Sequence, residues 1–146
     1  MTAPSENRSP SEAAEQFLMA IREGDPGAVW TSFSSGAKEF IISRGVRRGL
    51  PPELGNALLE ETADVLDHVE FLADLLAGLA KAFERIDMDR VIVDPQPTEL
   101  ADGRVKVVFL EEFYVEVGPQ LDPLPVGSLE MVRTAARWEV DRINPT

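Results

Sequence analysis

The chain has 146 residues, of which 26 are acidic and 14 basic, so its formal net charge is −12. The length fits one domain of ordinary size, and the negative field repels phosphate backbones and anionic lipid surfaces, so we expect neither nucleic-acid nor membrane partners. Cysteine is absent, which excludes disulfides and thiolate ligands, and one histidine among scattered carboxylates predicts no metal site and no cofactor.

The first residues are polar and contain no apolar leader segment. We expect residues 1–8 to form a disordered tail, followed by a single domain over residues 9–146. The absence of a visible signal peptide makes the cytoplasm the expected compartment.

Two helices are predicted at the start of the domain. Ser9 and Glu12 form a capping box with Pro10 between them, and Gly24 ends the first helix. Asp25, followed by proline, begins the second helix. Apolar side chains recur at helical spacing in both, at Ala14, Phe17, Leu18, Ile21, Val29, Trp30 and Phe33.

A short further turn of helix is expected around 37–41, and the glycines and prolines of the segment Arg44–Pro52 predict a break. Arg44, Arg47 and Arg48 in this segment are the densest basic cluster of an acidic chain. The cluster can bind an anionic ligand or an acidic partner segment, or it can be a solvated loop that balances nearby acids.

The sequence from Glu53 to Ile86 has helical periodicity, and we expect one long helix from about Thr62 to Arg85. Its apolar stripe consists of Val65, Val69, Leu72, Leu76, Leu79, Phe83 and Ile86. His68 lies beside this stripe, either as a candidate general base or as a boundary histidine without a catalytic task.

The pattern then changes to alternation with period two, which predicts strands. They are expected at Arg90–Asp94, Arg104–Val117, Leu129–Thr134 and Trp138–Ile143, with a hairpin turn at Asp102–Gly103 and a loop at Gly118–Pro125. Helices followed by a strand meander predict an α+β domain with an antiparallel sheet.

The segment from Phe17 to Asp25, the Val29–Phe33 segment after it and the closing Arg137–Ile143 segment resemble the first helix pair and the last strand of nuclear transport factor two-like proteins. The resemblance implies a cone in which the helices pack on a strongly bent antiparallel sheet around an apolar cavity. It also implies dimerisation through the sheet. Phe17 matches the position at which ketosteroid-isomerase-like members carry a tyrosine, so that mechanism is not expected here.

The longest predicted strand places one carboxylate on an apolar face. Alternate side chains of a strand lie on the same face, and those on the face of Glu111 are Val105, Val107, Phe109, Phe113, Val115 and Val117. Carboxylates in such surroundings are candidates for acid–base chemistry. The alternative is a β-bulge at Glu111–Glu112 that turns both side chains toward water.

The opposite face of this strand has polar ends and an apolar middle of Val108, Leu110 and Tyr114. An apolar centre with a charged rim is the anatomy of an interface, so we expect a homodimer that pairs through the sheet. The competing explanation is that the tail or the loop 118–125 covers this face.

The expected function is non-enzymatic binding of a hydrophobic small molecule or a partner protein through the cavity or the sheet. The candidate ligand-binding residues are Phe17, Trp30, Phe109, Phe113, Trp138 and Arg47. The alternative is an isomerase, dehydratase or cyclase that uses Glu111 and His68.

Overall fold

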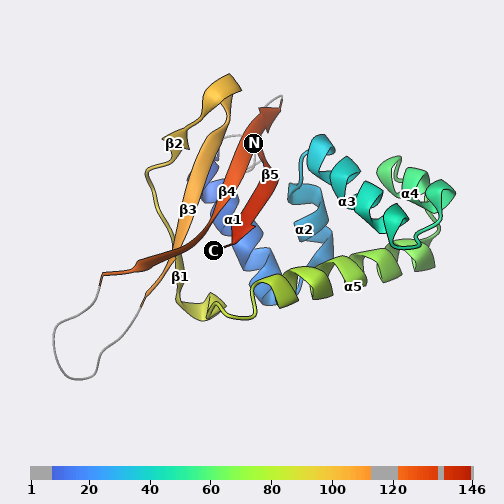
Figure 1. Cartoon of the computed structure of the whole chain (residues 1–146), viewed down its shortest axis with the longest axis horizontal. Helices are drawn as coiled ribbons and strands as arrows, with labels where there is room; N and C mark the ends of the chain where they lie inside the picture. Colours follow the sequence, from blue (N-terminus) through green and yellow to red (C-terminus); the bar gives the residue numbers. More distant parts are fainter. Residues whose placement is uncertain (1–7, 113–121, 135–136, 146) are drawn as a thin grey trace, which may run out of the picture.

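The computed structural model describes residues 8–112, 122–134 and 137–145, which form an α+β arrangement (Figure 1). Five α-helices come first, followed by an antiparallel sheet of five strands, both counted over these residues. The helices are α1 (Pro10–Glu23), α2 (Pro26–Ser32), α3 (Ser35–Arg47), α4 (Pro52–Leu59) and α5 (Val65–Ala82). The strands are β1 (Val91–Val93), β2 (Thr98–Glu99), β3 (Val105–Glu111), β4 (Leu124–Thr134) and β5 (Arg137–Pro145).

The predicted starts of the first two helices are confirmed. The Ser9 hydroxyl accepts from the backbone N–H of Glu12 at 3.1 Å, and the Asp25 carboxylate accepts from the N–H of Ala28 at 3.1 Å. Gly24 takes a left-handed conformation with a φ of 72° and ends α1. These are short-range signals, and local hydrogen bonding is enough to make them reliable.

The expectation of a short turn near 37–41 and a break from Arg44 is wrong, because α3 continues to Arg47. Gly45 lies inside the helix, where a Cβ atom would come within 3.3 Å of the Leu50 side chain. The close approach of Leu50 explains why a glycine is accommodated there. Gly49, two residues beyond the end of α3, takes a φ of 112°.

The single helical region predicted from Glu53 to Ile86 is divided into α4 and α5. After α4, Glu61 adopts a left-handed φ of 62°, and α5 begins at Val65. The predicted stripe of α5 is only partly covered. Leu72 and Phe83 are buried, whereas Val65 and Val69 are 74% and 57% exposed.

The sheet has the order β1-β3-β4-β5, and β2 also pairs with β3. The structure places a short strand at Thr98–Glu99 that the sequence did not predict, and β4 begins at Leu124, inside the expected loop. Residues 113–117 of the expected long strand lie outside the described residues. An irregularity follows Phe109, where Gly127 and Pro125 of β4 pair with consecutive residues of β3 and Val126 is the extra residue.

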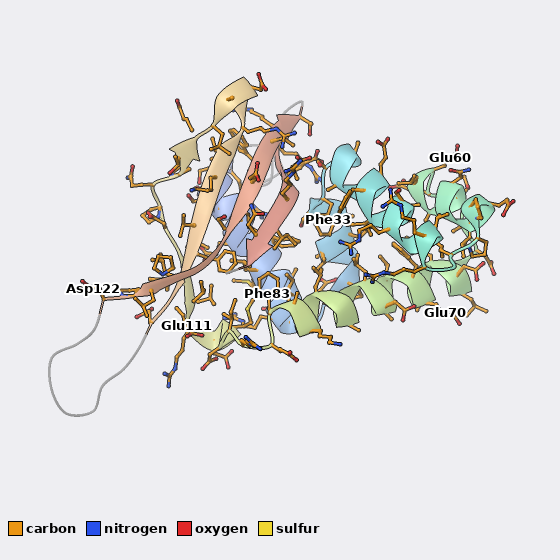
Figure 2. All side chains as sticks on the ribbon, viewed as in Figure 1. Phe33, Glu60, Glu70, Phe83, Glu111 and Asp122 are labelled. Atoms are coloured by element: carbon orange, nitrogen blue, oxygen red, sulfur yellow. The ribbon has the colours of Figure 1, made fainter. Side chains whose placement is uncertain are left out.

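One face of the sheet packs on α1, and the core lies between them (Figure 1). Inward side chains of β3 and β4 are fully or almost fully buried there, namely Val107, Phe109, Leu129 and Met131. Among the described helices, none covers the opposite face. Figure 2 shows Phe33 and Phe83 where the helical half meets the sheet.

The helices are fastened to the sheet at the start of α3. Phe33 forms a parallel bridge with Val140 of β5, and the N–H of Ser34 donates to the Val140 carbonyl at 2.9 Å. The Ser34 hydroxyl caps α3 by accepting from the N–H of Ala37 at 3.1 Å and donates to Asp141 at 2.7 Å. These bonds hold α3, and with it one wall of the site described next.

Candidate functional site

Two grooves open on different sides of α5, one toward α3 and one toward α2. The α3–α5 groove has a volume of about 780 Å³. Its walls are formed by Ile41, Arg44, Gly45, Arg48 and Leu50 from α3 and the turn after it, and by Phe71, Asp74, Leu75, Gly78, Leu79 and Ala82 from α5. The volume falls within the range of small-molecule sites.

The α3–α5 groove is apolar along its length and positive on one wall. Arg44 and Arg48 are exposed, and no ion pair to either was found among the described residues. The guanidinium carbon of Arg44 lies 5.8 Å from the centroid of the Phe40 ring. Asp74 adds one carboxylate on the opposite wall. The lining therefore carries a net positive charge in a protein whose total charge is −12.

The α2–α5 groove is smaller, about 300 Å³, and it brings together two of the predicted site residues. Trp30 from α2 and His68 from the first turn of α5 both line it, with Gly27, Thr31, Glu61, Ala63, Val65 and Leu72. Trp30 is only 4% exposed and packs edge-on against Phe71 with ring centroids 5.0 Å apart. The groove thus combines an apolar floor with a carboxylate and an imidazole.

Two predicted ligand-binding phenylalanines are core residues. Phe17 is fully buried, with its ring 5.3 Å from that of Phe33. Phe109 is fully buried between Phe83, 5.8 Å away, and the backbone of Gly127. Neighbouring side chains and backbone therefore fill the space beside both rings.

The remaining predicted ligand-binding residues do not meet at one place. Trp138 is half-buried beside a small pocket of about 60 Å³, and the Arg133 guanidinium lies 6.0 Å from its ring. Arg47 is exposed on the last turn of α3 and does not line the α3–α5 groove. Phe113 lies outside the described residues.

The two candidate catalytic residues lie at opposite ends of α5. Glu111 is half-buried at the end of β3, and its carboxylate accepts from the backbone N–H of Asp87, beyond the C-terminal end of α5, at 2.6 Å (Figure 2). His68 is in the first turn of α5. The helix rises by roughly 21 Å from His68 to Ala82 alone. One small substrate cannot contact both side chains.

A partly buried polar network that the sequence did not predict joins three elements. Asp141 of β5 accepts from the Ser34 hydroxyl and from the Arg104 guanidinium. Burial by itself raises the pKa of Asp141, but the hydrogen bonds from Ser34 and Arg104 outweigh it and hold the pKa below its usual range. The same hydrogen bond raises the pKa of Arg104. Because the Ser34 hydroxyl also caps α3, these bonds position α3 against β5.

The helical spacing of three residues of α3 indicates one wall of the α3–α5 groove, but the break predicted from Arg44 interrupted this pattern. Once α3 is helical to Arg47, Ile41, Arg44 and Arg48 follow one another at spacings of three and four and share a face. The partner wall on α5 has no such signal, because which helices meet across a groove is a tertiary property.

Within the described residues, no group of three or more acidic or histidine side chains is placed to hold a metal ion. None of the helices described has the length and apolarity needed to cross a membrane. A scan of protein-family models found no matching family, and searches of curated proteins and of solved structures found no match.

Proposed function

We propose that the protein is a non-enzymatic binding protein whose α3–α5 groove accommodates an elongated apolar small molecule with an anionic end group. The observation that carries this proposal is the joint lining of one groove by Phe71, Leu75 and Leu79 and by the guanidiniums of Arg44 and Arg48. A long-chain carboxylate has both features.

The two parts of such a ligand contribute differently. Burying each methylene of the tail stabilises the complex by about 0.8 kcal/mol, so the chain supplies most of the affinity. The guanidiniums bind the carboxylate through charge-assisted hydrogen bonds, which fix the orientation of the ligand. Because both arginines are exposed, their contribution is modest and falls with ionic strength.

The test is titration calorimetry with dodecanoate, compared with dodecanol, at low ionic strength. We expect saturable binding of dodecanoate, weakened about tenfold in the double variant R44Q/R48Q. The matched control is R47Q, which removes a neighbouring exposed arginine outside the groove and should change the affinity less than about twofold. Equal affinity for the alcohol, or equal effects of R47Q and R44Q/R48Q, would contradict the proposal.

We do not extend the proposal to isomerase, dehydratase or cyclase chemistry. That alternative needs the Glu111 carboxylate in an apolar cavity, but Glu111 lines neither groove and its carboxylate accepts from the N–H of Asp87, while His68 lies at the opposite end of α5. His68 shares its groove with Trp30 instead.

The homodimer through the sheet also remains a proposal. On the face of the sheet away from α1, Leu110 pairs with Ile92 of β1 and with Pro125 of β4, and Val108 lies two residues before it. This apolar row is bordered by the charged pair Lys106 and Glu130, as an interface centre and rim would be. Tyr114, the third predicted member, lies outside the described residues. Light scattering at micromolar concentration should give a dimer mass that L110E reduces to a monomer.

We also propose that the protein is a member of the nuclear transport factor two-like superfamily and is located in the cytoplasm. The helix-then-meander order supports the first, and a dimer that dissociates in L110E would add to that support.

A further inference from the structure

We infer that the α2–α5 groove is a second, separate ligand site, and that it binds a compact organic cation with an apolar body, such as an arylalkylamine. Trp30, Leu72, Glu61 and His68 together line this one groove of about 300 Å³. It does not depend on the function proposed for the α3–α5 groove.

The size and the floor of the groove favour a small ligand with a ring or a short chain. A volume of about 300 Å³ is at the lower end of the range for small-molecule sites. Ala63, Val65 and Leu72 supply aliphatic contacts, and Val65 is 74% exposed, so an apolar ligand would cover surface that now faces water.

The charge of the groove favours a cation. Glu60, Glu61, Asp64 and Asp67 all lie in the eight residues 60–67, which contain no lysine or arginine. Glu61 is the acidic member of this segment that lines the groove. His68, when neutral, offers a ring nitrogen that accepts a hydrogen bond from an ammonium group. An anion would meet repulsion from the same residues.

The backbone at Glu61 takes a conformation that favours glycine. Three helices end in the same way, with a backbone N–H bonded to a carbonyl five residues earlier, namely Asp25 to Ala20, Leu50 to Gly45 and Thr62 to Ala57. The left-handed residue of this motif is Gly24 in α1 and Gly49 in α3, but it is Glu61, with a φ of 62°, in α4. Glycine adopts this conformation without a steric penalty and glutamate does not. The chain thus tolerates local strain at a residue that lines the groove.

The experiment uses the full chain and the resonances of His68, which is the only histidine. Titration with 2-phenylethylammonium should shift the His68 ring signals saturably, with a dissociation constant of roughly 1 mM or below. Phenylacetate, which has the same ring and the opposite charge, should bind at least about tenfold more weakly. The double variant R44Q/R48Q should bind the amine like the wild type, so a failure of the dodecanoate site leaves this result unaffected.

Variants at position 61 separate the ligand site from ordinary surface charge. E61Q should weaken the amine about tenfold, and the control E60Q, at an exposed neighbour that does not line the groove, should change it less than about twofold. E61G should weaken the amine at least as much as E61Q while raising the melting temperature by about 2–4 °C, because the strain is relieved. Equal binding of amine and acid, equal effects of E61Q and E60Q, or no saturable shift would overturn the inference.

Discussion

The substitution Gly127→Ala examines the packing that excludes a cavity beside Phe109. A Cβ atom at Gly127 would lie 2.3 Å from Cζ and 2.8 Å from Cε2 of the Phe109 ring, far inside van der Waals contact. The ring is fully buried, and the ring of Phe83 lies 5.8 Å away, so it cannot move aside without displacing the core.

The magnitude follows from two opposing terms. Overpacking of this kind costs about 1–3 kcal/mol, and the severity of the contact places Gly127→Ala near the upper end. Replacing glycine by alanine also lowers the conformational entropy of the unfolded chain, which stabilises the folded state by about 0.5–1 kcal/mol. We therefore expect the free energy of unfolding to fall by about 2 kcal/mol.

Urea denaturation followed by tryptophan fluorescence measures this change. Gly78→Ala is the matched control, since no atom lies within 4 Å of its Cβ position on exposed helix, and it should stabilise by up to about 1 kcal/mol. In a Phe109→Leu background, Gly127→Ala should lower the free energy of unfolding by less, because the smaller side chain leaves room for the added methyl group. A double-mutant cycle measures this difference as a coupling energy. A loss below about 0.5 kcal/mol for Gly127→Ala alone would mean that Phe109 borders free space, as the expected cone cavity requires.

Two further predictions concern carboxylates. Glu111→Gln should lower the free energy of unfolding by about 0.5–1.5 kcal/mol in chemical denaturation, because a neutral acceptor replaces the charged one for the N–H of Asp87; an increase would show a buried charge without a partner. The pKa of Asp141 is below its usual value in the folded state, so its hydrogen bonds with Ser34 and Arg104 stabilise the protein above about pH 4, and this contribution is lost as the pH falls through the folded-state pKa. Unfolding curves between about pH 2 and pH 5 should therefore depend less steeply on pH in Asp141→Asn, and parallel curves would argue against the network.

Local hydrogen bonding and side-chain alternation determined much of the fold from the sequence alone. The caps at Ser9 and Asp25 and the left-handed Gly24 appear where they were predicted, because each depends on atoms within four or five residues. The alternation of Val105, Val107 and Phe109 likewise indicated the buried face of β3 correctly. It could not place Glu111, whose acceptor role depends on Asp87, which lies 24 residues earlier.

Only the tertiary structure decided which apolar positions are covered and where the grooves lie. Val65 and Val69 share helical spacing with the buried Leu72 and Phe83, yet they are exposed, and Val65 borders the open α2–α5 groove (the course of α5 is seen in Figure 1). Periodicity identifies a face of a helix, but it carries no information on how far the neighbouring elements extend along it. The same holds for contacts between distant segments. Ser34 bonds to Asp141 across 107 residues, and Arg44 and Leu75 line one groove, and no local pattern in the sequence indicates that these segments meet.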